Sequence, residues 1–345
     1  MYLLVVLWGV SMRAGILKIF KRGAKPEGEQ VEETRSSITQ ATGEPLILGF
    51  LSGKGGCGKS TISVNTAILL SALSNKGEGV LAIDMDITNA TLTNMLLSVT
   101  PDILKEDDGV STIDYITEGA EKYVFYKLEF PPNKVFNIQV SGRKDLGVPV
   151  KDLYVLPAKK ATVSYEQRLS ALAHLTQEEI RDSLLELFNS ARKFAKERNV
   201  KYIIFDFPPF RPDQRKVYEG VFALVEYIPN FVMVCSFDYA AVHGLIGVLD
   251  RRYSYLKTRT LGFLINMAVL EDEKTVESIR RYIETIYGKG VVHFIRSDPR
   301  WRINFLPPII LGDPGEGAHY DLISAYAKIG ILDREGVVKK LNIKL

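Results

Sequence analysis

The chain has 345 residues, of which 46% are hydrophobic and 25% are charged, and these proportions exclude a disordered chain. Its 44 basic and 41 acidic side chains leave a formal net charge of +3, which is too small to require a polyanionic partner. Two cysteines and four scattered histidines exclude a disulfide framework and offer no paired-cysteine metal site, as expected in a reducing cytoplasm.

Residues 1–43 are predicted to be an N-terminal tail and linker outside the folded domain. The run MYLLVVLWGV at the start is apolar, but it is about half as long as a membrane span requires. Basic side chains follow this run instead of preceding it, which argues against a signal peptide. Two interpretations stay open for the start: a frayed terminus, or translation from Met12 followed by a short membrane-surface helix. Residues 23–43 are rich in Glu, Lys, Gly, Ser and Thr, as flexible linkers are.

A glycine-rich segment lies between an apolar run, Leu46–Leu51, and a helical pattern. It reads GKGGCGKST and fits the phosphate-loop pattern G-x-x-x-x-G-K-[ST], in which glycines let backbone N–H groups wrap phosphates closely. Lys59 is expected to reach the β- and γ-phosphates of a nucleoside triphosphate, and the hydroxyl of Ser60 to bind Mg²⁺. The helix N-terminus behind them adds its positive end. The predicted nucleotide-binding residues of this loop are Gly53, Gly55, Gly56, Cys57, Gly58, Lys59, Ser60 and Thr61.

A second lysine, Lys54, directly follows the first glycine of this loop. The run KGGCGKST resembles the deviant Walker A loop of the ParA/MinD class of ATPases, whose relatives include Mrp-type, ArsA-type and nitrogenase-iron-protein-type members. The resemblance implies an α/β fold with a doubly wound, mostly parallel sheet, which binds and hydrolyses ATP with Mg²⁺. It also implies an ATP-dependent homodimer, in which Lys54 reaches the other subunit's ATP and supplies positive charge as an arginine finger does. Lys54 and Lys59 are therefore catalytic candidates.

Two carboxylates follow the second predicted strand, Gly79–Asp84, which ends in the sequence Asp84-Met85-Asp86. The carboxyl ends of parallel strands border the ligand crevice of an open α/β sheet. The resemblance identifies this stretch as switch I, in which Asp86 orients the attacking water and Asp84 lies near Mg²⁺. An alternative interpretation makes Asp86 a helix N-cap.

A third carboxylate, Asp206, ends the apolar stretch KYIIFDFPP. In a Walker B role it would accept a hydrogen bond from a water bound to Mg²⁺. The two prolines after it resemble the D-x-P-P turn of switch II in the same class. The predicted metal-site residues are Ser60, Asp84 and Asp206.

Strands and helices alternate along the rest of the chain, which predicts a mostly parallel, doubly wound sheet. Thr176 and Glu179 form a capping box before a long amphipathic helix. The ATPase domain is predicted to span residues 44–333, with an insertion near residues 101–147 to which the sequence assigns no role. The later strand and helix pairs are predicted at residues 231–237 with 239–255, 261–267 with 273–287, and 291–295 with 317–331.

Two further ATP contacts are implied by the resemblance alone. In the family, an asparagine at the end of the strand that here reads LGFLINM contacts the adenine, and this maps onto Asn266. The loop after the following strand supplies another base contact through a proline-containing turn, which maps onto Pro299. The turn here reads RSDP, which departs from the family's pattern.

Two charged segments are candidates for the surface that the protein recognises. Basic and aromatic residues interleave at Arg251, Arg252, Tyr253, Tyr255, Lys257 and Arg259. This cluster could contact DNA phosphates non-specifically, or it could simply be cations near a helix C-terminus. Residues 334–345 are predicted to be a basic amphipathic tail, either a membrane anchor like that of MinD-like proteins or a short strand.

The function implied by the resemblance is an ATP-driven dimerisation switch in intracellular positioning or partitioning, at the division site or of a chromosome or plasmid. An unidentified protein would stimulate hydrolysis, and the switch would be cytoplasmic, with peripheral binding at the inner membrane face as an option. One alternative is an ATP-driven carrier of the ArsA/Mrp class, whose iron–sulfur members need paired cysteines. Another is a positioning factor for a surface appendage.

Overall fold

A computed structural model describes residues 43–97, 110–118, 125–129, 136–158, 170, 172–210, 217–301, 308–310 and 312–345. The chain divides into two units, Met1–Thr39 and Gln40–Leu345, and the described residues all belong to the second unit. The predicted N-terminal tail with Met12 therefore lies outside the described residues, apart from Gly43. No helix among the described residues combines the length and the apolar character that crossing a bilayer demands.

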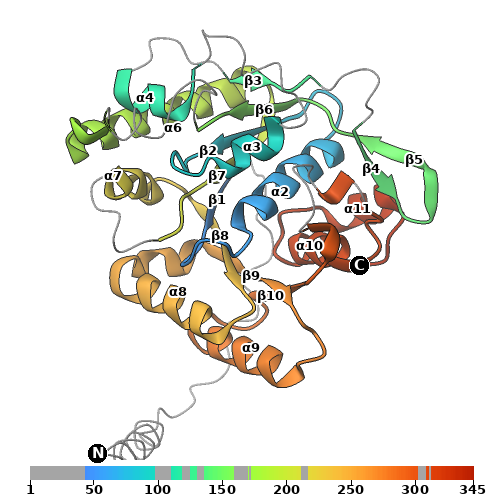
Figure 1. The fold of residues 1–345 in the computed structure, drawn as a ribbon. Helices are drawn as coiled ribbons and strands as arrows, with labels where there is room; N and C mark the ends of the chain where they lie inside the picture. The colour runs from blue at the N-terminus through green and yellow to red at the C-terminus, as the bar shows by residue number, and fades with distance from the viewer. Residues whose placement is uncertain are drawn as a thin grey trace, which may run out of the picture. The chain divides into compact units, whose positions relative to one another are not determined.

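Eight of the described strands form one sheet in the order β10-β9-β8-β1-β7-β2-β6-β3 (Figure 1). Neighbours in this sheet run parallel, except that β3 pairs antiparallel with β6. The mostly parallel, doubly wound sheet predicted from the sequence is therefore confirmed. The strands are β1 (Leu46–Leu51), β2 (Gly79–Asp84), β3 (Tyr126–Lys127), β4 (Asn137–Val140), β5 (Arg143–Pro149), β6 (Leu153–Leu156), β7 (Val200–Asp206), β8 (Asn230–Ser236), β9 (Thr260–Ala268) and β10 (Val292–Arg296).

Helices follow most strands of the sheet, as expected for βαβ units. The described α-helices are α2 (Lys59–Leu73), α3 (Thr91–Leu97), α4 (Thr112–Glu118), α6 (Gln177–Glu197), α7 (Val217–Ala223), α8 (Tyr239–Arg252), α9 (Glu273–Tyr287), α10 (Gly317–Lys328) and α11 (Arg334–Leu341). Short 3₁₀ helices are η1 (Leu224–Glu226), η2 (Ser254–Arg259), η3 (Pro299–Trp301) and η4 (Pro308–Ile310).

The core is built on both faces of the sheet because alternate strand residues point to opposite sides. On β1, Ile47 and Leu51 join a cluster with the buried faces of α4, α6, α7, α8 and α9. Leu48 and Phe50, which are also fully buried, point to the other face. There α2 lies beside α10 and α11 (Figure 1), and the hydroxyls of Thr66 in α2 and Tyr326 in α10 share a hydrogen bond. The two layers bury β1 and thereby fix the position of the phosphate loop that follows it.

The long helix α6 begins as its sequence predicts. The side chain of Thr176 accepts a hydrogen bond from the backbone of Glu179, and the Glu179 carboxylate accepts one from the backbone N–H of Thr176. Both partners lie within one turn, so the capping box needs no distant part of the chain.

The described parts of the predicted insertion include a β-hairpin. Strands β4 and β5 pair antiparallel and form a second, two-stranded sheet. The backbone N–H of Ser141 at the hairpin turn donates to the carbonyl of Leu341, and Asn342 donates to the carbonyl of Ser141. The hairpin therefore lies against the C-terminal segment.

That C-terminal segment, residues 334–345, was predicted to be a basic amphipathic tail, and part of it is buried in the domain. It forms α11, so the alternative of a short strand is wrong. The ammonium of Lys340 donates to the backbone carbonyls of Leu73 and Ser74 at the end of α2. A membrane-anchor role would require α11 to leave α2, because part of its apolar face is buried in the domain. The buried side chains of the segment are Val337, Leu341 and Ile343.

Candidate nucleotide-binding site

The phosphate loop joins β1 to α2, and close backbone approaches explain two of its glycines. A Cβ atom on Gly58 would lie 2.2 Å from Nδ2 of Asn266, and one on Gly53 would lie 3.0 Å from backbone and side-chain atoms of Leu245 in α8. Gly58 also adopts a left-handed backbone conformation, with φ of 84°, which glycine adopts without strain. A larger residue at Gly58 would therefore displace the loop or Asn266.

The N-terminal end of α2 is left open for an anion. Its N-cap residue is Gly58, which has no side chain to accept from the first N–H groups, and the first turn contains no acidic residue. Unpaired N–H groups and the helix dipole together favour a negative ligand at this end. This is the geometry that the phosphate-loop pattern predicted.

Lys59 forms a buried ion pair with Asp206. Its Nζ atom lies 2.6 Å from Oδ1 of Asp206 and 3.2 Å from Oγ of Ser60. The hydroxyl of Ser63, one turn further along α2, donates to the same Asp206 oxygen at 2.8 Å. The tertiary fold thus brings together the phosphate-loop lysine and the predicted Walker B carboxylate, which are 147 positions apart.

The surroundings of Asp206 fit a magnesium site. Its second oxygen, Oδ2, is buried and has no hydrogen-bond partner within the described part of the chain. Mg²⁺ binds oxygen ligands and keeps several of its waters. Oδ2 of Asp206 can accept a hydrogen bond from such a water. Ser60 lies within reach of the same lysine, so the two predicted metal-site residues Ser60 and Asp206 adjoin each other.

Asp84 ends β2 directly beside Asp206, and its side chain is turned toward α3. Its Oδ1 accepts from the backbone N–H of Asp86 at 3.0 Å, and its Oδ2 accepts from the N–H and hydroxyl of Thr93, both at 2.8 Å. Burial, together with the negative charges of Asp206 and Asp86, raises the pKa of Asp84 to about 8. In this arrangement Asp84 fastens α3 to β2, and its predicted place near Mg²⁺ stays a prediction.

Asp86 lies at the nucleotide cavity with its carboxylate held from one side. Oδ1 accepts from the Thr88 hydroxyl at 2.7 Å and from the Asn89 backbone N–H at 3.1 Å, and Oδ2 accepts from the Asn89 side chain at 2.9 Å. Asp86 is not the N-cap of α3, because that helix begins at Thr91. Its side chain instead holds the turn that precedes the helix.

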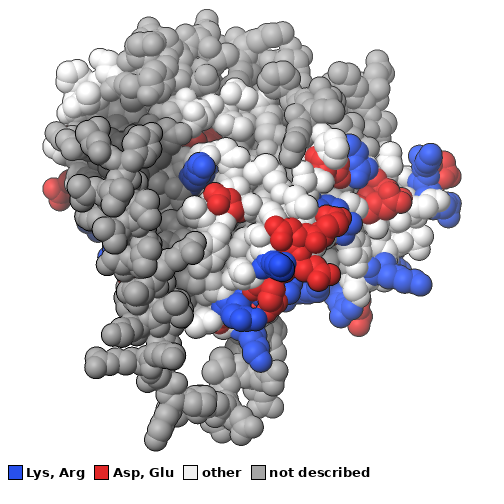
Figure 2. Space-filling model, turned by 60° about the horizontal axis from the view of Figure 1, so that its bottom comes forward, with Lys and Arg blue, Asp and Glu red and all other residues white. Residues whose placement is uncertain are grey.

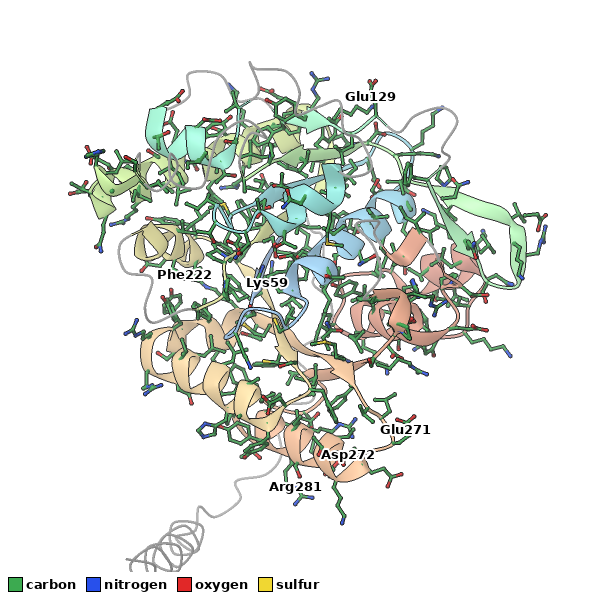
Figure 3. The ribbon with its side chains drawn as sticks, viewed as in Figure 1. Lys59, Glu129, Phe222, Glu271, Asp272 and Arg281 are labelled. Carbon is green, nitrogen blue, oxygen red and sulfur yellow. The ribbon has the colours of Figure 1, made fainter. Side chains whose placement is uncertain are left out.

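These residues surround a cavity of about 740 Å³ at the start of α2, where Figure 3 shows Lys59. Lys54 lies on the exposed loop at this cavity, and no ion pair ties it to a carboxylate among the described residues. Asp84, Asp206, Asn266 and Pro299 are not part of the lining. The lining residues are Ser52, Gly53, Lys54, Gly55, Gly56, Cys57, Gly58, Lys59, Ser60, Thr61, Asp86, Asn89, Thr91, Pro209 and Phe210.

Five lining residues, Ser52, Asn89, Thr91, Pro209 and Phe210, were not among the site residues predicted from the sequence. Asn89 and Thr91 follow Asp86 closely, so their proximity in the chain was an available signal. Phe210 follows the proline pair, and its N–H donates to the carbonyl of Ser52 at 2.8 Å. Its ring stacks between those of Phe222 and Tyr253, with centroid distances of 4.7 and 4.9 Å. Only the fold could reveal this stack.

The two predicted base contacts lie away from the cavity lining. Nδ2 of Asn266 donates to the carbonyl of Cys57 at 2.9 Å, so this side chain holds the phosphate loop from behind. Cys57 is itself buried, and burial raises the pKa of its thiol. Pro299 is exposed at the start of η3, beside the ion pair of Asp298 and Arg300. Adenine contacts by Asn266 and Pro299 stay predictions.

Most cations of the predicted basic cluster already contact their own chain. Arg259 donates to the carbonyl of Glu226 at 2.6 Å, and Arg251 donates to that of Gly247 at 2.8 Å. Lys257 lies over the ring of Tyr287, 5.9 Å from its centroid. On the face seen in Figure 2, described acidic and basic side chains are interspersed, so no single-sign field dominates there.

Comparison with solved structures places the fold among known proteins. A MinD septum site-determining protein with Mg-ADP from Pyrococcus horikoshii OT3 is 18% identical, with a TM-score of 0.54 over 84% of this chain and 98% of that chain. A Cyanothece McdA variant with ATP is also 18% identical, with a TM-score of 0.55 over 88% and 98%. A putative plasmid partition protein from Borrelia burgdorferi B31, bound to AMPPNP, is 17% identical, with a TM-score of 0.52 over 83% and 99%.

At these identities the similarity establishes the fold, and no curated protein matches the chain by sequence. The family follows from a separate comparison, in which the model of the CobQ/CobB/MinD/ParA nucleotide binding domain matches residues 48–303. The match spans the phosphate loop, both predicted switch regions and seven complete strands of the eight-stranded sheet, β2, β3, β6, β7, β8, β9 and β10. The chain belongs to the CobQ/CobB/MinD/ParA family of nucleotide-binding domains.

Proposed function

We propose that this protein is an ATPase whose nucleotide state controls dimerisation of the chain. The observation that carries the proposal is the open end of α2, where Lys59 and Asp206 form a buried ion pair behind the cavity. Lys59 is a cation held in place without being exposed, and the N–H groups around it have no acceptor from a cap. A triphosphate supplies both the charge and the acceptors that this end lacks.

In this proposal the phosphates replace Asp206 as the partner of Lys59. The carboxylate of Asp206 is then available to hold Mg²⁺ through a bound water, and Ser60 is the second residue that would hold the ion. The ion would neutralise charge that develops on the phosphates during transfer. Asp86, which lines the same cavity, orients the attacking water. Lys54 is exposed at the cavity, as a residue that serves a second subunit must be.

The cellular role that we propose is positioning or partitioning of a cargo inside the cell. Membership of the family and the fold shared with a MinD, a McdA and a plasmid partition protein support this role. We propose a cytoplasmic homodimer whose hydrolysis is stimulated by a partner protein. A solved complex of MinC with MinD from Aquifex aeolicus, which is 20% identical to this chain with a TM-score of 0.50, gives a precedent for a partner.

The test compares the parent protein with Lys54→Ala and Asp86→Ala. Nucleotide affinity, ATP turnover and mass in solution are measured in Mg-ATP and in Mg-ADP. We expect the parent to dimerise in Mg-ATP and to be monomeric in Mg-ADP. Lys54→Ala should bind ATP normally but lose turnover by about 10³-fold, the scale seen when a charge supplied in trans is removed. Asp86→Ala should remain a dimer in Mg-ATP because hydrolysis no longer ends that state.

Lys76→Ala is the matched control, because Lys76 is an exposed lysine in the loop at the opposite end of α2. Its turnover should equal that of the parent. Parental turnover by Lys54→Ala would refute the dimer mechanism while leaving nucleotide binding intact. Failure of the parent to bind Mg-ATP would refute the proposed function as a whole.

A further inference from the structure

We infer that Asn89 is a positioning residue for hydrolysis, which fixes the carboxylate of Asp86 at the nucleotide cavity. The inference rests on the proposed function, in which Asp86 orients the attacking water. It concerns a different residue, whose side chain was not among the predicted site residues. Asn89 is exposed and lines the cavity, whereas the Asp86 side chain beside it is only 3% exposed.

Both oxygens of Asp86 are held by this one asparagine. The backbone N–H of Asn89 donates to Oδ1 at 3.1 Å, and its side-chain Nδ2 donates to Oδ2 at 2.9 Å. One bond alone would leave the carboxylate free to rotate about its last torsion angle, which is broad for aspartate. Two bonds from one residue to both oxygens fix the plane of the carboxylate. The Thr88 hydroxyl also donates to Oδ1, at 2.7 Å.

A carboxylate oxygen that accepts one hydrogen bond keeps a lone pair for another donor. Oδ2 accepts from the Asn89 side chain, so it can also accept from a water in the cavity. Asn89 thus determines where that second acceptor site points. A displacement of about 1 Å in such a group can cost about 10²-fold in rate, so the orientation carries a measurable effect.

The backbone of this turn is strained in a way that serves the contact. Ala90 has φ of 49°, a left-handed conformation that alanine rarely adopts, and its side chain is fully buried. Its N–H donates to the carbonyl of Asp86 at 2.7 Å, which closes a tight turn. A non-glycine residue in this conformation is strained, and the conformation persists where the surroundings fix it. The turn brings Asn89 back over Asp86.

A separate set of hydrogen bonds, made by Thr93, anchors α3, so the positioning role of Asn89 is distinct from anchoring that helix. The N–H and hydroxyl of Thr93 both donate to Asp84, and they tie the start of α3 to the end of β2. The helix is therefore held without the Asn89 side chain. Removal of the Asn89 side-chain amide should leave the fold in place and release Oδ2 of Asp86, while the Asn89 backbone N–H and the Thr88 hydroxyl still hold Oδ1.

The test measures steady-state ATP hydrolysis, nucleotide affinity and melting temperature for Asn89→Ala, Asn89→Ser, Asp86→Ala and the double variant. We expect Asn89→Ala to lower kcat by about 10- to 100-fold, with KM, nucleotide affinity and melting temperature close to those of the parent. Asn89→Ser keeps a hydroxyl donor and should recover part of the rate. The double variant should be no slower than Asp86→Ala, because a residue that acts through Asp86 has nothing left to position.

Asn94→Ala is the matched control, since Asn94 is an exposed asparagine of α3 whose side-chain amide donates to the backbone carbonyl of Asn89 and not to the Asp86 carboxylate. It should retain the parental kcat. Parental kcat in Asn89→Ala with an inactive Asp86→Ala would overturn the inference and leave the proposed function standing. A clear loss of nucleotide affinity or a lower melting temperature in Asn89→Ala would also overturn the inference, because either result would indicate a structural role for Asn89. Parental turnover by Asp86→Ala would overturn the inference together with the proposed role of Asp86.

Discussion

The two ends of α2 differ in whether the rest of the chain supplies hydrogen-bond partners for the terminal backbone groups. At the C-terminal end, the carbonyl of Leu70 accepts from the N–H and hydroxyl of Ser74, and Lys340 donates to the carbonyls of Leu73 and Ser74. At the N-terminal end, Gly58 provides no side-chain acceptor and the first turn has no acidic residue. A cation at a helix C-terminus is favourable, and an open N-terminus attracts an anion. The chain satisfies one end of the helix itself and leaves the other for a ligand.

The largest expected effect is at the open end, where Lys59→Ala removes the cation. Nucleotide affinity should fall by about 100-fold or more, because charge-assisted hydrogen bonds to two phosphates are lost. The variant also leaves Asp206 fully buried without its ion-pair partner, which should lower the free energy of unfolding by about 3–5 kcal/mol. Fluorescent-nucleotide titration and urea denaturation measure the two effects. Parental affinity in this variant would mean that α2 does not receive the phosphates.

A smaller effect, confined to stability, is expected at the closed end. Leu341→Ala removes a fully buried side chain of α11 and should lower the free energy of unfolding by about 2–5 kcal/mol. Nucleotide affinity, measured at a temperature where the variant is folded, should stay within about twofold. Val338→Ala, at a 36% exposed position of the same helix, should change stability by less than about 0.5 kcal/mol. If Leu341→Ala weakened nucleotide binding as Lys59→Ala does, the two ends would be coupled.

A gradual effect, spread over several pH units, is expected from Asp84, which lies beside Asp206 near the open end of α2. Asp84 holds its proton up to about pH 8 in the nucleotide- and metal-free fold, whereas an unfolded aspartate releases it near pH 4. The native state therefore binds more protons than the unfolded state between these values. Stability from this group is complete below about pH 4 and is lost by roughly 1 kcal/mol per pH unit as the pH rises toward 8.

Asp84→Asn cannot titrate, so its unfolding free energy should lack this slope between pH 5 and 8. Urea denaturation of parent and variant in EDTA, without nucleotide, measures the difference at each pH. Parallel curves across this window would show that Asp84 titrates as it does in the unfolded chain. Leu341→Ala should run parallel to the parent in the same experiment, because the C-terminal end of α2 involves no shifted carboxyl group.

Contacts between residues close in the chain were the ones that could be predicted. The capping box of α6 lies within one turn, and the phosphate loop shows its glycines and lysines in one short run. The contact of Asn89 with Asp86 is also local, but it depends on the left-handed turn at Ala90, which no sequence pattern predicted. Alanine gives no signal for such a conformation, and the role of Asn89 was therefore missed.

Contacts between distant residues were predicted only where a family pattern joined them. Lys59 and Asp206 were assigned to one site through the two Walker motifs, but the direct ion pair between these residues, 147 positions apart, was not predicted. Asn266 was assigned to adenine by resemblance, and the structure shows it bonded to the Cys57 carbonyl of the phosphate loop. No sequence pattern predicted that the rings of Phe210 and Tyr253 would stack.

The sequence by itself determined the strand, loop and helix at the phosphate site, because glycine conformations and helix ends depend on local chemistry. It also determined that the sheet is mostly parallel, through the alternation of strands with helices. The tertiary structure decided which apolar faces are free. Residues 334–345 have the pattern of an amphipathic helix, but a pattern cannot say whether water, a membrane or another helix covers its apolar side. Packing against α2 and the β4–β5 hairpin covers part of that side, because burying it there removes apolar surface from water.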